Sequence, residues 1–209
     1  MINSFESNIF INCPFDEEFS KLLKPIIFTI LYANLNPRIS LEMQDSASDR
    51  LEHIFTLIEE SRYAIHDLSR LECNSPQELP RMNMPFELGI DFGARKFGNK
   101  ALKKKKCLVL EAQPYRYQAA ISDLSGRDIN HHSNDPLKAV QIVRDWVYVN
   151  CNRNLPAPSK VWNSYTDFLG ALYEDLQHRL GYSEKEIDEI KIPELMQHMQ
   201  IWIAEIQAT

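Results

Sequence analysis

The sequence predicts an α/β protein with a parallel sheet, followed by a C-terminal helical extension. Short β-rich runs alternate with segments whose apolar residues recur at three- and four-residue steps, as in strand–helix–strand units. Residues 107–110 are continuously apolar, which is typical of a strand buried in a parallel sheet. After Pro156 and Pro158 only helical patterns follow, so we expect an α/β domain over residues 1–151 and a helical extension over 159–209.

The first predicted unit is a strand, a turn and a long helix. Residues 8–12 form a β-rich run, and Cys13-Pro14-Phe15 follows as a turn. Asp16 and the two acids after it predict a helix N-terminus, because a carboxylate there caps free backbone N–H groups. Apolar residues at helical spacing continue to a helix end near Asn34, and Pro37 prevents any extension.

The middle of the chain predicts two further strands with a helix between them. Residues 38–42 alternate between apolar and polar side chains, and a polar loop follows at 44–49. Residues 50–61 place apolar side chains on one helical face, and 63–67 form a third strand. The polar segment 71–82 contains two prolines and is expected to be an exposed loop over the carboxyl end of that strand.

The second half of the chain begins with a helix opened by Pro85, because proline suits the first turn of a helix. A fourth strand over 107–110 and a short strand over 127–130 complete the predicted sheet. The remaining predicted helices cover residues 137–149, 159–179, 183–190 and 193–207. The last three share an apolar seam that packs on the α/β domain or serves self-association, so we expect a homo-oligomer.

Composition favours an ordinary globular protein over a nucleic-acid binder. The chain has 209 residues, 44% hydrophobic and 25% charged, with a net charge of -6. A general nucleic-acid binder would carry a basic surface instead. The one basic run, Lys103–Lys106, is expected to be a solvated loop.

Cysteine spacing and the N-terminus predict a cytoplasmic protein without a metal site. The four cysteines form no Cys-x-x-Cys or Cys/His cluster, and scattered thiols suit a reducing compartment. The first six residues lack the pattern of a signal peptide, and the longest apolar stretch, 25–35, is too short to cross a bilayer. We therefore expect neither membrane nor nucleic acid as a partner.

A parallel sheet would gather polar residues at the carboxyl ends of its first three strands, beside the start of the helix that carries Glu87. Glu87 is the candidate catalytic residue. The candidate substrate-binding residues are Asn12, Cys13, Pro14, Phe15, Asp45, Arg50, Asp67, Ser69, Arg70, Asn83 and Met84.

These residue types suit cleavage of an N-glycosidic bond. Asn and Ser can bind a sugar hydroxyl, Phe15 can stack on a ring, and Arg50 or Arg70 can form a fork on a phosphate. The reaction passes through an oxocarbenium-like centre, which one carboxylate beneath the sugar can stabilise or attack. A nicotinamide leaving group needs no general acid, whereas a neutral base needs one, and Asp67 or Asp45 is available.

Each residue also has a structural interpretation. Glu87 could complement a helix dipole in the first turn, and Asn12 and Asp67 could close turns. Arg50 could pair with Asp45, Asp49 or Glu60 on the surface. Phe15 could be a core residue, and His66 could be a buried residue inside a strand. Cys13 at a helix start could have a lowered pKa, but a nucleophilic role would need a nearby His base, and none is evident. His131-His132 lacks a third ligand, and no Gly-rich phosphate loop occurs.

Two short motifs resemble a known superfamily. Ile9-Phe10-Ile11-Asn12-Cys13-Pro14-Phe15 is similar to the first strand and loop of nucleoside 2-deoxyribosyltransferases and of Toll/interleukin-1 receptor (TIR) domains. Phe86-Glu87-Leu88-Gly89 is similar to the segment that carries the catalytic glutamate of the transferases. NAD-cleaving TIR domains likewise place their glutamate in the helix after the third strand. The resemblance covers about residues 8–149, and the order of the motifs supports it.

The resemblance implies a flavodoxin-like fold, a nucleotide or nucleoside ligand and Glu87 as nucleophile or oxocarbenium stabiliser. Bacterial TIR relatives often act as NAD-consuming effectors in antiviral defence. Two departures concern the long loop between Ser69 and Met84 and the C-terminal helices, which could replace the oligomer contacts of the transferases.

We therefore expect a hydrolase that cleaves NAD, with NAD as substrate and no cofactor. A nucleoside or nucleotide deoxyribosyltransferase or hydrolase is the enzymatic alternative. A non-catalytic TIR-like module that binds a nucleotide signal, or acts as a scaffold, is the alternative of another class.

Overall fold

The computed structural model describes residues 4–42, 45, 47–71 and 81–208. Its centre is a five-stranded sheet in which every neighbouring pair is parallel, with the strand order β2-β1-β3-β4-β5. The strands are β1 (Asn8–Asn12), β2 (Asn36–Ile39), β3 (Tyr63–Asp67), β4 (Lys106–Glu111) and β5 (Ile129–His131). The fold is therefore flavodoxin-like: the alternation of strands and helices predicted the parallel sheet, and the resemblance implied the flavodoxin-like fold.

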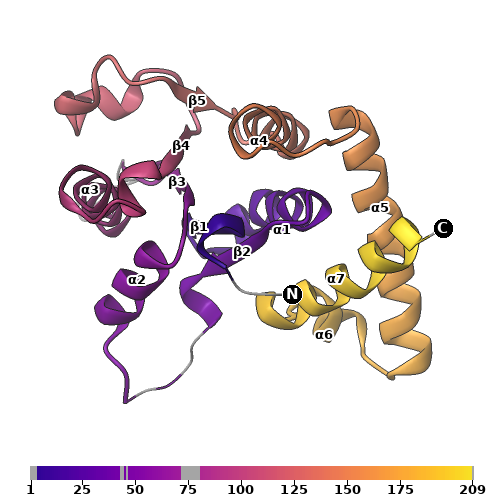
Figure 1. Cartoon of the computed structure of the whole chain (residues 1–209). Helices are drawn as coiled ribbons and strands as arrows, with labels where there is room; N and C mark the ends of the chain where they lie inside the picture. The colour runs from indigo at the N-terminus through magenta and orange to yellow at the C-terminus, as the bar shows by residue number, and fades with distance from the viewer. Residues whose placement is uncertain (1–3, 43–44, 46, 72–80, 209) are drawn as a thin grey trace, which may run out of the picture.

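Helices cover both faces of this sheet (Figure 1). The helices α1 (Glu17–Tyr32) and α4 (Pro136–Cys151) lie on one face, and α2 (Arg50–Glu59) and α3 (Asn83–Phe97) lie on the other. Alternate residues of each strand supply the two cores, because successive side chains point to opposite faces. In β1, Ile9 and Ile11 belong to the α1 core, while Phe10 packs against α2.

The C-terminal helices form a further layer over α1 (Figure 1). They are α5 (Pro158–Glu174), extended by a π-helical turn (Asp175–Arg179), α6 (Glu184–Asp188) and α7 (Ile192–Ala208). Phe28 of α1 is fully buried, and its ring centroid lies 5.4–6.0 Å from those of Tyr165, Phe168 and Trp202. The core of the sheet and that of the extension are therefore one continuous hydrophobic cluster.

The second strand differs from the prediction. It covers Asn36–Ile39 instead of 38–42, and Ser40–Glu42 forms a 3₁₀ turn. Pro37 is tolerated in β2 because this is an edge strand, where one side of the backbone needs no ladder partner. Glu42 accepts a hydrogen bond from the Ile39 backbone N–H at 2.7 Å and pairs with Arg38 at 2.8 Å, which ends the strand.

Other predicted boundaries shift by one or two residues. The long helix ends at Tyr32 instead of near Asn34, and the short fifth strand covers Ile129–His131 instead of 127–130. The basic run was wrongly expected to be wholly solvated, because Lys105 is buried. Parts of the loops predicted over 44–49 and 71–82 lie outside the described residues, as does Cys73.

Three further 3₁₀ turns lie around β4 and before β5, at Leu102–Lys104, Arg116–Ala119 and Ser122–Leu124, and a fourth, Phe5–Ser7, precedes β1. Among the described residues, none of the helices combines the length and apolar character that a membrane crossing requires.

We predict that Phe28→Ala lowers the free energy of unfolding by about 3–5 kcal/mol, because it leaves a cavity where α1 meets the C-terminal helices. Urea unfolding followed by circular dichroism measures this loss. Ile201→Ala is the matched control, since Ile201 is 60% exposed. It should change the same free energy by less than about 0.5 kcal/mol. Equal losses in the two variants would contradict the shared core.

Candidate functional site

A pocket of about 510 Å³ opens at the carboxyl end of β1, between the loop that follows this strand and the start of α3. Its size falls within the range of small-molecule sites. Eight predicted site residues line it: Asn12, Cys13, Pro14, Phe15, Arg50, Asn83, Met84 and Glu87. Phe10, Ile11, Ser40, Arg81 and Met82 complete the lining. The parallel sheet thus brings together residues that are up to 75 positions apart, from Asn12 to Glu87.

Glu87 is the fifth residue of α3, which starts at Asn83, so it lies beyond the first turn where it was expected. A helix dipole acts mainly within the first turn, and this interpretation therefore explains little of its position. The side chain is only 6% exposed. In the described part of the chain, no hydrogen bond or ion pair reaches its carboxylate.

Burial raises the pKa of Glu87 to about 7, and the positive charge of Arg50 offsets part of this effect. A carboxyl group with such a pKa exchanges its proton near neutral pH. Perturbed carboxyl groups of this kind, buried in a pocket and without a protein partner, are typical of functional sites. Glu87 can therefore act either as an anion or as an acid.

Cys13 is buried beside these acids. Its burial, followed by the negative charges of Asp67, Glu87 and Asp16, raises the pKa of the thiol well above its usual value. The possibility of a lowered pKa at the start of α1 is therefore wrong, because desolvation and the neighbouring acids dominate. Cys13 contributes a protonated thiol to the pocket wall and is no nucleophile in this state.

Asp67 and Ser69 are absent from the pocket lining. Asp67 Oδ1 accepts the Ser69 backbone N–H at 2.9 Å, which is the turn-closing role considered for this residue. Asp67 Oδ2 and Ser69 Oγ lie 3.0 and 3.1 Å from the same atom, Nε2 of His132. A hydrolytic triad would use both ring nitrogens, one for each partner, so this buried cluster does not have triad geometry.

Of the candidate arginines, Arg50 lines the pocket and Arg70 does not. Arg70 pairs with Asp16 at 3.1 Å and with Glu18 at 2.7 Å. Within the described residues, none of the ion pairs includes Arg50.

The acids considered as partners of Arg50 have other contacts. Asp45 accepts from Ala47 N and Ser48 Oγ, and Asp49 caps α2. Glu60 pairs with Arg38. Asp45 is exposed and absent from the pocket lining, so its contacts here are those of a local turn.

Sequence reasoning missed a second arginine of the pocket, Arg81, and the polar Ser40. Arg81 lies two residues before α3, and its guanidinium is 3.6 Å from the Asp16 carboxylate. Its place just ahead of the Pro85 helix start was an available signal. Ser40 was missed because the sequence predicted a strand over 38–42, which placed Ser40 inside the strand. β2 ends at Ile39, so Ser40 is the first residue beyond it.

The orientation of Asn12 follows from its partners. Its Nδ2 donates to the Met84 carbonyl at 2.8 Å and lies 3.1 Å from His66 Nδ1. A carbonyl can only accept, so the atom that faces Met84 must be the nitrogen. His66 Nδ1 therefore accepts as well, and its ring proton lies on Nε2, which donates to Asp91 at 3.0 Å. These bonds leave Asn12 Oδ1 as the acceptor that the side chain offers to the pocket.

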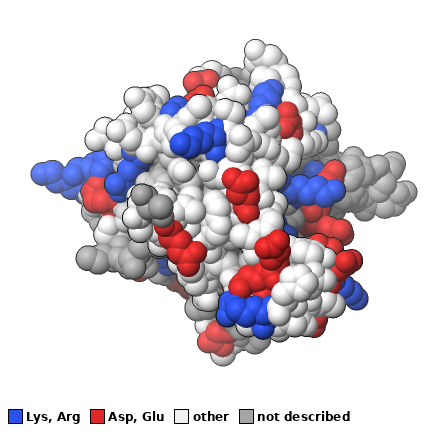
Figure 2. Space-filling model, turned by 90° about the vertical axis from the view of Figure 1, so that its right-hand side faces the viewer, with Lys and Arg blue, Asp and Glu red and all other residues white. Residues whose placement is uncertain are grey.

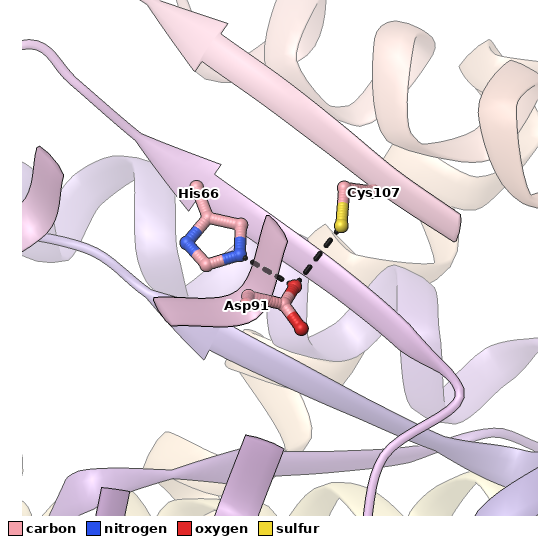
Figure 3. Close-up of side chains that lie close together, drawn as sticks. All are labelled: His66, Asp91 and Cys107. Carbon is pink, nitrogen blue, oxygen red and sulfur yellow. Dashed lines mark hydrogen bonds and ion pairs between the residues drawn. The ribbon is translucent and has the colours of Figure 1, made fainter. Parts of the chain in front are cut away.

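His66, Asp91 and Cys107 form a compact group beneath this site (Figure 3). His66 Nε2 and Cys107 Sγ each lie 3.0 Å from Asp91 Oδ2, and the buried ammonium of Lys105 lies 3.0 Å from Asp91 Oδ1. Lys105 also donates to the carbonyls of Ile58 and Ser61. The group thus joins α3 to β3, β4 and the end of α2.

The electrostatics of this group favour an ion cluster over a metal centre. Burial raises the pKa of Asp91, but the hydrogen bond from His66 and the electrostatic interaction with its polar N–H, followed by the charge of Lys105, outweigh this and lower it to about 2. Burial and the nearby Asp91 charge raise the pKa of Cys107 well above its usual value, so its thiol stays protonated. His, Asp and Cys are metal-ligating types within reach of one another. Lys105, however, already supplies the cation that Asp91 needs.

We predict that Asp91→Asn lowers the free energy of unfolding by about 3–5 kcal/mol, because it leaves the Lys105 ammonium buried without its counter-charge. Urea unfolding at neutral pH measures the loss. Asp91→Asn combined with Lys105→Met should recover part of it, since the unpaired charge is then gone. Asp188→Asn, at an exposed acid of α6, is the control. No recovery in the double variant would contradict the ion pair.

The same pair predicts a pH dependence of stability. The lowered pKa of Asp91 means that its contribution is present above its ordinary pKa of 3.8 and is lost as the pH falls towards about 2. Asp91→Asn should therefore flatten this part of the stability curve.

Comparison with known proteins adds no relative. No protein-family model, no curated protein and no solved structure matches this chain. The chain is thus described by its topology and by the residues of its pocket.

Proposed function

We propose that this protein cleaves N-glycosidic bonds, with Glu87 as the catalytic carboxylate and NAD as the favoured substrate. The observation that carries the proposal is a buried, unpaired carboxyl group in a pocket that also holds Asn12 and two arginines. The order of the two short motifs that resemble deoxyribosyltransferases and TIR domains supports it as well.

Different pocket residues suit the phosphates, the sugar and the ring of a dinucleotide. Arg50 and Arg81 are the cations suited to the phosphates. Asn12 Oδ1 can accept a hydrogen bond from a sugar hydroxyl, because both Asn12 N–H groups are already used. Phe15, near the end of the loop before α1, packs against the core but is half-buried, so its exposed part offers a ring for stacking.

In the proposed reaction the bond between the sugar C1′ and the nicotinamide nitrogen breaks, and its electron pair leaves with the ring. The ring was cationic and becomes neutral, so no proton has to be supplied. The ionised Glu87 carboxylate stabilises or attacks the electron-poor C1′. Water then adds its oxygen at C1′ and releases one proton, which balances the hydrolysis.

A nucleoside or nucleotide hydrolase or transferase is the second candidate, and the pKa of Glu87 favours it. With a pKa of about 7, half of the Glu87 side chains are protonated near neutral pH. A protonated carboxyl can donate to a neutral leaving base. Asp67 was the sequence candidate for that proton, but its bonds to Ser69 and His132 lie outside the pocket.

A non-catalytic module that binds a nucleotide signal is the alternative of another class, in which Glu87 would only accept hydrogen bonds from the ligand. A Glu87–Arg ion pair far from Asn12 and Asp67 would favour this alternative, and within the described residues Glu87 forms no ion pair. A pocket lined by two arginines and an unpaired glutamate also suits a reacting sugar between phosphate and carboxylate.

We predict that Glu87→Gln lowers nicotinamide release from NAD by about a hundredfold or more, while NAD binding is retained. Chromatography of the products measures release, and calorimetry measures binding. Glu59→Gln, an exposed acid at the end of α2, should keep full activity. Full turnover by Glu87→Gln would rule out the catalytic assignment. Base release from nucleosides without release from NAD would select the second candidate.

The same assay run over a range of protein concentrations tests whether the active form is a homo-oligomer. Specific activity that rises steeply with concentration indicates a site completed by a second copy of the chain. Constant specific activity indicates that one copy suffices.

The pH profile separates the two forms of Glu87. If NAD is the substrate, the ionised form is active, so kcat/KM should fall as the pH drops below about 7. If Glu87 acts as an acid on a neutral base, kcat/KM should fall as the pH rises above the same value. Initial rates between about pH 5 and pH 9 decide the direction. A flat profile would contradict both roles.

A further inference from the structure

A second hollow lies away from the Glu87 pocket and is lined almost entirely by cations. It has a volume of about 290 Å³ and is lined by Phe92, Arg95, Lys96, Lys103 and Arg127. Arg95 and Lys96 belong to the last turn of α3, Lys103 to the 3₁₀ turn before β4, and Arg127 to the loop before β5. Three separate segments therefore direct positive charge into one place.

The four cations lack the partners that surface cations commonly have. In the ranges that the structure describes, none of them forms an ion pair or a side-chain hydrogen bond. No acid lines the hollow, although the chain has 29 acidic and only 23 basic residues. Like charges held close together repel one another, so this arrangement is unfavourable until an anion binds.

Ordinary helix electrostatics account for only part of the cluster. Arg95 and Lys96 lie in the last turn of α3, where cations complement the helix dipole. Lys103 and Arg127 lie outside that helix and gain nothing from its dipole. Their addition to the same hollow needs another explanation, and a bound anion supplies one.

The aromatic residue of the hollow is already covered. The Arg127 guanidinium carbon lies 5.0 Å from the centroid of the Phe92 ring, a cation–π contact that holds this arginine over the hollow. The ring is therefore not free to stack on a base. The recognition that remains is of negative charge, for which guanidinium and ammonium groups suit phosphate oxygens.

We propose that this hollow binds a small ligand through a chain of phosphates, such as an oligophosphate or the phosphate tail of a nucleotide. The small volume and the four cations suit two or three linked phosphates better than a polymer. A nucleic acid would need a basic stripe along the surface, and the net charge of -6 opposes it. The face of the C-terminal helices bears several groups of acidic side chains (Figure 2).

The site is separate from the proposed catalytic pocket, since the two lie at opposite ends of α3. Glu87 is near the N-terminus of that helix and at the carboxyl edge of the sheet. Arg95 and Lys96 end the same helix, beside the segments that lead into β4 and β5. The proposal therefore holds whether or not Glu87 cleaves NAD.

Titration calorimetry with sodium tripolyphosphate tests this proposal on the full chain. We expect binding at low ionic strength that weakens towards about 0.15 M salt, because exposed charges are screened. Lys103→Ala combined with Arg127→Ala should weaken binding about tenfold or more, a loss of about 1.4 kcal/mol. All four cations are exposed enough for the variant to keep its fold, which thermal melting verifies.

The matched control is Lys160→Ala combined with Lys191→Ala, which removes the same two charges from exposed positions near α5 and α7. An equal loss of binding in both pairs would show a general charge effect and overturn the site. No binding to the wild type would also overturn it. The affinities for tripolyphosphate and for ATP are then compared: tighter binding of tripolyphosphate indicates a free oligophosphate, and tighter binding of ATP indicates the phosphate tail of a nucleotide. Oligonucleotides whose affinity rises with length would replace the proposal with nucleic-acid binding.

Discussion

The ion pair between Asp91 and Lys105 is the interaction on which the rest of the site depends. Both groups are buried, and an unpaired charge in either place would be costly. Asp91 lies one helical turn after Glu87, so the pair fixes the rotation of α3 against β3 and β4. Through His66 it also sets the orientation of Asn12, whose amide reaches back to the first turn of α3. The position of Glu87 is thus secured by a buried charge and by a hydrogen-bonded chain.

Most of the fold could be predicted because its signals are local. Apolar spacing gave the helices, and alternation of strands with helices gave a parallel sheet. The sheet order 2-1-3-4-5 could not be predicted from the apolar pattern, since it depends on pairings between distant segments, and only the resemblance to flavodoxin-like proteins implied it. The predicted second strand began two residues too late, because Pro37 was taken as a boundary although an edge strand accepts it, and it ended three residues too late, because Ser40–Glu42 forms a 3₁₀ turn. The prediction that the basic run Lys103–Lys106 is solvated was wrong for Lys105. Its partner Asp91 is 14 residues away in the sequence and lies on another element.

The sequence could predict which residues lie at the carboxyl edge of the sheet, because the topology decides this. It could not predict which of these side chains are bound by other side chains. Eight of the candidate residues line one pocket because β1 and α3 meet at the carboxyl edge. Asp67, Ser69 and Arg70 also lie at that edge, but His132, Asp16 and Glu18 hold their side chains. Such partners come from other segments, and a single sequence does not reveal them. Arg81 was missed although its position just ahead of the predicted helix was visible in the sequence, because only the structure places the start of α3 beside β1.

The aromatic cluster around Phe28 has a consequence for the order in which the protein is made. A ribosome synthesises α1 early, but Trp202, which covers Phe28, comes near the end of the chain. Even the hydrogen bond from Gln207 to the Tyr32 carbonyl spans 175 positions. Until those residues are synthesised, α1 therefore presents an uncovered aromatic surface, and the nascent chain depends on their later docking to hide it. Such a surface is a natural target for chaperones that bind exposed apolar segments.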